Sequence, residues 1–196
     1  AIFGWRHIVV RTAECASELL PEEFDGYRIL QLSDIHIGTF SRSPGVIKKM
    51  VDMALAQHAD LIVFTGDLVN VSASEVIPFT HELARLSAPD GIYSVMGNHD
   101  YCEYGKDAAA GKVARTGESA AHRNQRILEY MEQKAGWRLL MNQHTLIERR
   151  GASIALIGVE NISKPPFPEY GNLPKAMDGL PRGMFKILLS HDPSHW

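Results

Sequence analysis

The seven residues Leu61-Ile62-Val63-Phe64-Thr65-Gly66-Asp67 decide the fold class of this chain. A short, continuous apolar run that ends at a glycine is typical of a strand buried on both faces of a parallel sheet. We therefore expect a strand over 61–64. Asp67 then lies at the carboxyl end of this strand, which is where α/β sheets bind their ligands.

Strands and helices alternate on both sides of this stretch. The sequence predicts strands over 27–32 and 92–96, and apolar residues on one face predict a helix over 46–54. A second helix is indicated by the spacing of Val76, Phe79, Leu83 and Leu86. With a first short strand at Ile8-Val9-Val10, the first hundred residues follow the order β, β-α-β-α-β. This order favours an α/β layer with parallel strands.

The second half of the chain begins with a segment, 101–121, that has no periodicity and is expected to be a loop. A helix is predicted over 122–134. Three further strands are predicted over 137–147, 153–159 and 185–189, with a proline-rich loop over 164–168. The length of 196 residues fits one domain over 1–196.

Composition limits the class of protein. The chain is 45% hydrophobic and 22% charged, as is usual for a globular protein. Its formal net charge of −3 argues against a general nucleic-acid binder. No apolar run approaches the roughly 20 residues that span a bilayer, and no signal peptide is recognisable. Membrane association or export through a segment upstream of Ala1 remains an open expectation, and localisation is not predicted.

Polar residues of one chemical kind follow four predicted strands: Asp34-Ile35-His36, Gly66-Asp67, Gly97-Asn98-His99-Asp100 and Ser190-His191-Asp192. Because strand ends deliver side chains into a shared crevice, we expect these residues to meet. Carboxylate, amide and imidazole groups together suit Mn²⁺, Fe²⁺ or Zn²⁺ better than Ca²⁺. In an extended chain Asp34 and His36 would point the same way and reach one ion. The glycines before Asp67 and Asn98 would allow sharp turns and close approach.

Each of these motifs also has an ordinary structural explanation. Asp34 and His36 could belong to a turn after a strand, and Asp67 and Asn98 are common turn residues. His191 stands just before Asp192-Pro193, a pair that often opens a helix. These explanations fail together if the four strands are neighbours. A basic cluster either holds an anionic substrate or forms a solvated face; it comprises Lys106, Lys112, Arg115, Arg123 and Arg126.

In this order, the four motifs resemble the first four motifs of the calcineurin-like metallophosphoesterases. The resemblance runs from Gln31 to Asp192, and the sequence from Leu32 to Gly38 is similar to that of envelope-associated bacterial phosphoesterases. Some members of that subgroup are exported or anchored. The resemblance implies an α/β fold in which a two-sheet β-sandwich is flanked by helices.

The resemblance also implies roles for individual residues. The implied metal ligands are Asp34 and His36 for the first ion, Asn98 and His191 for the second, and Asp67 as the bridge between them. The implied catalytic residues are His99, as general acid or transition-state stabiliser, and Asp100, which orients the His99 ring. Two divalent ions, Mn, Fe or Zn, would support hydrolysis of a phosphate ester or pyrophosphate bond. The substrate would be a phosphorylated small molecule or a lipid-linked molecule.

The family has a fifth motif, Gly-His-x-His, which does not occur in residues 1–196. We therefore expect this domain to stop before the motif and to lack one ligand per metal. The main rival hypothesis is a binding scaffold of the same fold without catalysis. His99 favours an enzyme, because non-enzymatic members of the family often lack that histidine. A nuclease is a second rival, which the acidic net charge disfavours.

Overall fold

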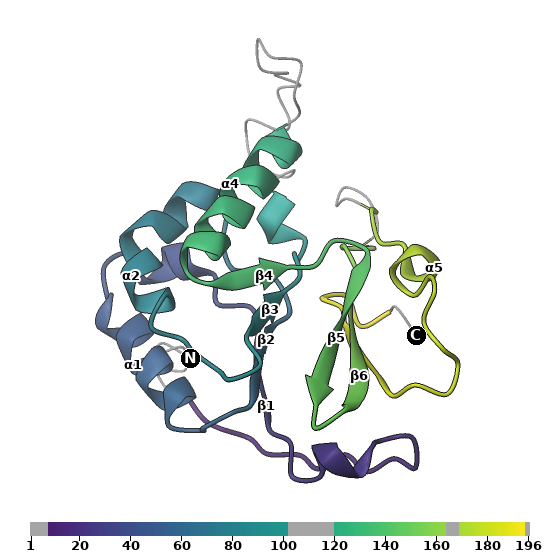
Figure 1. Cartoon of the computed structure of the whole chain (residues 1–196). Helices are drawn as coiled ribbons and strands as arrows, with labels where there is room; N and C mark the ends of the chain where they lie inside the picture. Colours follow the sequence, from purple (N-terminus) through teal and green to yellow (C-terminus); the bar gives the residue numbers. More distant parts are fainter. Residues whose placement is uncertain (1–7, 102–119, 164–168, 195–196) are drawn as a thin grey trace.

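The computed structural model describes residues 8–101, 120–163 and 169–194 (Figure 1). Its first sheet has the order β1-β2-β3-β4, and all neighbours are parallel. These strands are Ile29–Leu32, Leu61–Phe64, Ile92–Ser94 and Trp137–Leu139. In the second sheet, β5 (Gln143–Arg149) is antiparallel to β6 (Ala152–Gly158), and β6 is parallel to β7 (Lys186–Leu189).

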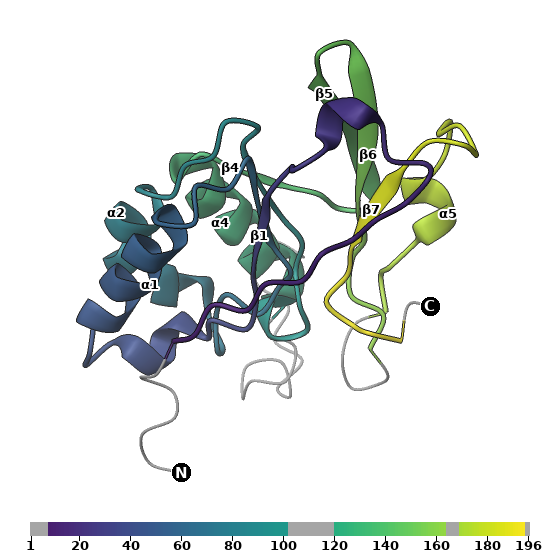
Figure 2. The same cartoon turned by 90° about the horizontal axis from the view of Figure 1, so that it is seen from below.

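The two sheets face each other and helices cover their outer faces (Figures 1 and 2). On the first sheet these helices are α1 (Gly45–Leu55), α2 (Thr80–Leu83) and α4 (Ala120–Lys134). The short helix α5 (Leu173–Ala176) packs on the outer face of the second sheet. The predicted architecture, a two-sheet β-sandwich flanked by helices, is confirmed.

Strand β2 shows why residues 61–67 indicate a parallel sheet with a core on each face. Ile62 and Phe64 lie in the core between the first sheet and its helices. Leu61 and Val63 alternate with them and lie in the core between the two sheets. All four side chains are at most 3% exposed, and burying an aliphatic or aromatic side chain contributes about 1.5–3 kcal/mol. The strand is therefore buried on both faces, as predicted.

One predicted strand is wrong. Residues 8–17 form no regular secondary structure, and Val9 and Val10 are 56% and 47% exposed. A strand needs a hydrogen-bonded neighbour, and the described residues offer none to this segment. Apolar β-branched residues alone were therefore an insufficient signal.

Two other predicted elements are divided in the structure. The helix expected around Val76 and Leu86 consists of a 3₁₀ helix, Ala73–Phe79, followed by α2. Pro78 lies inside it and has no N–H to continue α-helical hydrogen bonding. The strand predicted over 137–147 becomes β4 and β5, because the chain crosses from one sheet to the other at Asn142, which has a φ of 52°. Residues 102–119 of the predicted loop and the proline-rich loop 164–168 lie outside the described residues.

Candidate metal centre

The segments after β1 and β2 stay side by side beyond the sheet. The backbone N–H groups of Asp34, His36 and Ile37 donate to the carbonyl groups of Gly66, Asp67 and Leu68, at 3.0, 3.0 and 2.8 Å. These segments are not extended. Asp34, His36 and Asp67 have φ angles of 52°, 45° and 59°, so the expectation that alternate residues of an extended chain bring Asp34 and His36 together is wrong. Left-handed turns orient them instead.

Two glycines allow the loops after β2 and β3 to approach each other, as predicted. A Cβ on Gly66 would lie 2.5 Å from the backbone nitrogen of Gly97. A Cβ on Gly97 would collide with the carboxylate of Asp67. Any larger residue at either position would force the loops that carry Asp67 and Asn98 apart.

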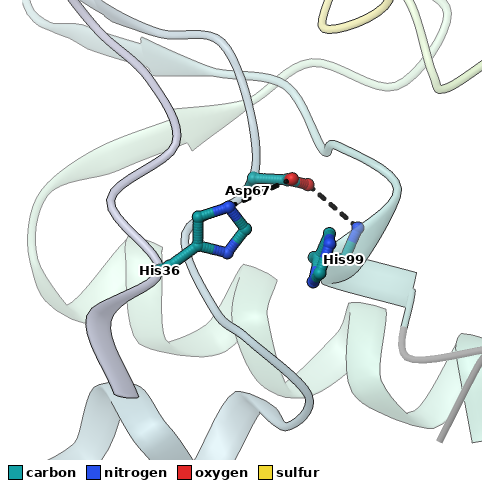
Figure 3. A group of neighbouring side chains, drawn as sticks. All are labelled: His36, Asp67 and His99. Atoms are coloured by element: carbon teal, nitrogen blue, oxygen red, sulfur yellow. Dashed lines mark hydrogen bonds and ion pairs between the residues drawn. The ribbon is translucent and has the colours of Figure 1, made fainter. Parts of the chain in front are cut away.

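Asp67 lies at the centre of the site. Its carboxylate is 3.6 Å from Nε2 of His36 and 3.5 Å from Nε2 of His191, and it accepts a 2.9 Å hydrogen bond from the N–H of His99. Ligand atoms within 4.8 Å of one another form two groups that share Asp67. One group is His36, Asp67 and His99 (Figure 3), and the other is Asp34, Asp67 and His191.

These groups bring the predicted site residues together, although their pairing differs from the predicted one. Asn98 joins the second group, because its Oδ1 lies 3.1 Å from Nε2 of His191. A ring nitrogen of His99 lies within 4.8 Å of the ligand atoms of His36 and Asp67, and its ring meets the His36 ring edge-on at 4.6 Å. The assignment of Asp34 with His36 to one ion, and of His99 to a role without metal, stays a prediction.

The three histidines are held in the same way. Nδ1 of His36, His99 and His191 lies 3.3, 2.8 and 2.9 Å from the backbone carbonyl oxygens of Val69, Asn70 and Thr65, respectively. A carbonyl oxygen only accepts hydrogen bonds, so Nδ1 carries the proton in each ring. Each Nε2 then keeps its lone pair in the neutral ring, which is the form that binds a metal. Together with two carboxylates, this donor set fits divalent ions such as Mn²⁺, Fe²⁺ or Zn²⁺.

The hydrogen bonds of the Asp100 carboxylate go to the backbone, and its role in orienting the His99 ring stays a prediction. It is 2% exposed, and its carboxylate accepts hydrogen bonds from the N–H groups of Asp67, Val69 and Gly97 at 2.7, 3.1 and 2.9 Å. Burial raises the pKa of Asp100 to about 6, and these hydrogen bonds oppose the rise. Nδ1 of His99 meets the carbonyl of Asn70 instead. Asp100 therefore fixes the loop that carries the site, and Asn70 holds the imidazole.

The residue types in the sequence did not reveal the backbone carbonyl groups of Thr65, Val69 and Asn70, because side-chain identity says nothing about main-chain partners. Glu75 accepts hydrogen bonds from the backbone of residues 70–72. The sequence did contain a signal for this residue, because Ser72 and Glu75 have the spacing of a helix capping box.

Of the basic cluster, Arg123 and Arg126 are exposed on α4, and the rest lies outside the described residues. Among the described helices, none is both long and apolar enough to cross a membrane.

Comparison with known proteins agrees with this geometry. The family described as calcineurin-like phosphoesterase matches residues 27–195, a range that contains every predicted site residue. The chain belongs to this family. The predicted resemblance is thus confirmed, and with it the assignment to a family of metallophosphoesterases.

Several metallophosphoesterases are similar to this chain. The uncharacterized metallophosphoesterase YkuE of Bacillus subtilis is 30% identical over 183 residues, which cover 90% of this chain and 54% of YkuE. The UDP-2,3-diacylglucosamine pyrophosphatase LpxG of Chlamydia trachomatis is 36% identical over 98 residues, 48% of this chain and 30% of LpxG. A transmembrane protein with metallophosphoesterase domain from Danio rerio is 27% identical over 184 residues, 92% of this chain and 38% of that protein. The chain thus spans about half, or less, of the length of these relatives.

A solved structure is also similar, the phosphopantetheinyl hydrolase PptH of Mycobacterium tuberculosis. The alignment covers 66% of this chain and 40% of that chain, with a TM-score of 0.40 and 16% identity.

Proposed function

We propose that this protein hydrolyses phosphate ester or pyrophosphate bonds with two divalent metal ions, Mn, Fe or Zn, on either side of Asp67. One observation carries the proposal: two groups of ligand atoms share the Asp67 carboxylate, and each spans no more than 4.8 Å. A carboxylate shared in this way can bridge two ions. The matched family supports the reaction class.

In this proposal each residue has a distinct task. Asp34, His36, Asn98 and His191 supply the remaining ligands, and the backbone carbonyls behind the rings keep each Nε2 directed into the site. When bound, the two ions would supply an activated water and offset the charge of the phosphoryl group. His99 takes up a proton from solvent at Nε2, whose lone pair is free in the neutral ring, and passes it to the leaving oxygen, while its Nδ1–H stays on the Asn70 carbonyl 2.8 Å away.

The surroundings of the site indicate the kind of substrate. Beside Asn70 lies an open groove of about 450 Å³. Its lining holds one acidic side chain and no cationic one, and it consists of Gly38, Thr39, Ser41, Asn70, Glu75, Pro78 and Phe79. We propose that the phosphoryl group would bind at the ions held by Asp67 and that this groove takes an uncharged part of the substrate. LpxG, by its name a UDP-2,3-diacylglucosamine pyrophosphatase, makes a lipid-linked pyrophosphate a candidate as well as small phosphate esters.

A direct test assays hydrolysis of p-nitrophenyl phosphate, bis(p-nitrophenyl) phosphate and a nucleotide-sugar pyrophosphate with Mn²⁺. The Asp67→Asn variant should lose activity on whichever substrate the wild type hydrolyses. Asp90→Asn is the matched control, because Asp90 precedes β3 at the opposite end of the sheet and accepts a hydrogen bond from Tyr27. Equal rates in the two variants, or no hydrolysis of any of these substrates by the wild type, would count against the proposal.

A further inference from the structure

Glu75 is an acidic side chain whose hydrogen bonds all converge on one short loop. Its Oε2 accepts from the N–H of Asn70 at 2.7 Å, and its Oε1 accepts from Val71 and Ser72 at 3.1 and 3.2 Å. Three successive N–H groups thus point at one carboxylate. This fixes the peptide planes of the loop, including the plane that carries the Asn70 carbonyl.

The fixed loop is the one that orients the histidines. The Asn70 carbonyl meets Nδ1 of His99, and the Val69 carbonyl meets Nδ1 of His36. Asp100 holds the same loop from its other end through the N–H groups of Asp67 and Val69. Two carboxylates therefore hold the loop from opposite ends, and Glu75 is the one nearer to the carbonyl behind His99.

Glu75 also contacts the segment after β1. A Cβ on Gly38 would collide with the Glu75 carboxylate, so Gly38 allows that carboxylate to pack against the turn that follows His36. The amide of Asn70 reaches the same turn through a 3.0 Å hydrogen bond to the Thr39 hydroxyl. One carboxylate thus links the turn after His36 with the loop behind His99.

We infer that Glu75 is a positioning residue for His99, an inference that rests on the proposed function. Through the N–H of Val71, which shares a peptide plane with the Asn70 carbonyl, Glu75 holds that carbonyl in place. The carbonyl keeps the Nδ1 proton of the His99 ring, so Nε2 is free to take up the proton that it passes to the leaving oxygen. Glu75 lines the groove beside Asn70, but in this account it touches neither a metal ligand nor the phosphoryl group. Its loss should therefore change the orientation of His99 rather than remove a ligand.

The test replaces Glu75 by Gln, which keeps the size but turns one acceptor into a donor facing N–H groups. Glu82→Gln is the matched control, because Glu82 lies on the neighbouring helix α2 and bonds to Arg85. Nitrogen-15 NMR of the metal-free protein reports the imidazole tautomer. We expect the Nδ1–H form of His99 to be retained in the wild type and in Glu82→Gln, and to be lost or mixed in Glu75→Gln.

Kinetics provide the second measurement. On an alkyl ester, whose leaving group needs a proton, Glu75→Gln should lose roughly 10–100-fold in kcat, as is usual for residues that orient an active-site group. On a nitrophenyl ester the loss in kcat should be smaller. The KM for each ester and the metal content of the variant should stay within about twofold of the wild type. General destabilisation would lower both rates equally.

Gly38→Ala is a second variant, which pushes the carboxylate aside without removing it, and it serves if Glu75→Gln does not fold. It should reproduce the change in tautomer and the loss on the alkyl ester. An unchanged His99 tautomer in the folded variants would overturn the inference, and so would equal losses on both esters. If the wild type hydrolyses neither ester, the proposed function fails, while the tautomer still decides the role of Glu75.

Discussion

Three of the predicted metal ligands have an unusual backbone conformation. Asp34, His36 and Asp67 all have positive φ angles, which cost a residue with a side chain roughly 1–2 kcal/mol each. Such strain is retained where the surrounding structure imposes it, and it is common at functional sites. Here it turns the side chains after β1 and β2 toward one another. The residue types predicted that these side chains meet, but they did not predict the bends that bring them together.

The position of Asp67 in both ligand groups gives a prediction about metal content. Asp67→Asn should abolish binding of two ions, because the amide brings no charge and only one good donor atom to a shared position. His36→Ala should mainly weaken one ion, since it removes a ligand from one group only. Elemental analysis of the dialysed variants tests this. Two tightly held ions in Asp67→Asn would mean that the carboxylate does not bridge.

Metal content and reaction rate, measured on the same variant, decide whether His99 is a metal ligand or a proton donor. If it donates a proton and binds no metal, His99→Ala should retain both ions and lose roughly 10²–10⁴-fold in rate on alkyl esters. The loss should shrink on nitrophenyl esters, which leave without a proton. Loss of one ion in His99→Ala would instead identify His99 as a ligand, as its distance to His36 and Asp67 also allows.

At the level of whole elements, helix α4 is joined to β3 by a buried acid. Glu132 is 5% exposed, and its carboxylate accepts a 2.5 Å hydrogen bond from the Ser94 hydroxyl. Burial raises the pKa of Glu132 to about 8, and the hydrogen bond from Ser94 opposes the rise. In the folded chain this group therefore stays protonated at pH values where it is ionised in the unfolded chain.

The raised pKa of Glu132 predicts a pH dependence of stability. Its stabilising effect is fully present below the pKa of the unfolded chain, roughly 4.3, and is lost as the pH rises through about 8. The free energy of unfolding should then fall by about 2–4 kcal/mol from this source. Glu132→Gln, which resembles the protonated acid, should show a smaller fall than the wild type in urea unfolding at pH 5, 6.5 and 8. Parallel curves for the two proteins would contradict this.

The elements differ in how far the sequence predicts them. Strands β1, β2 and β3 and helix α1 follow from their apolar patterns, because each packs apolar residues into the core between the first sheet and its helices. The strand at Ile8-Val9-Val10 was wrong, since its pattern lacks a partner strand. The crossing at Asn142 was missed, because it depends on side-chain hydrogen bonds to Glu160 and the Tyr170 carbonyl, both distant in sequence.

For the molecule as a whole, the site lies where the ends of β1, β2, β3 and β7 meet, so strands from both sheets contribute to it. The sequence predicted this meeting from the four motifs alone. It did not predict the carbonyl groups and the carboxylates of Asp100 and Glu75 that hold the loops, because these contacts require the folded arrangement. The side chains that meet at the site were therefore easier to predict than the contacts that position them.

We propose that two histidines of a Gly-His-x-His motif complete the two metal sites. Residues 1–196 contain no such motif, and fewer protein ligands give weaker metal binding and less stabilisation by the metal. Calorimetric titration with Mn²⁺ should therefore show weaker binding to residues 1–196 than to a longer natural chain that carries the motif. Equal affinities would mean that the ligands in residues 1–196 suffice and that our assignment of the metal sites is wrong.

The central claim is that Asp67 bridges two metal ions at the strand ends. It is tested most directly by anomalous X-ray scattering from crystals of this protein soaked in millimolar Mn²⁺, a concentration that fills weak sites as well. We predict two anomalous peaks about 3.5–4 Å apart, one on each side of the Asp67 carboxylate. A single peak, or peaks that do not contact Asp67, would contradict the claim.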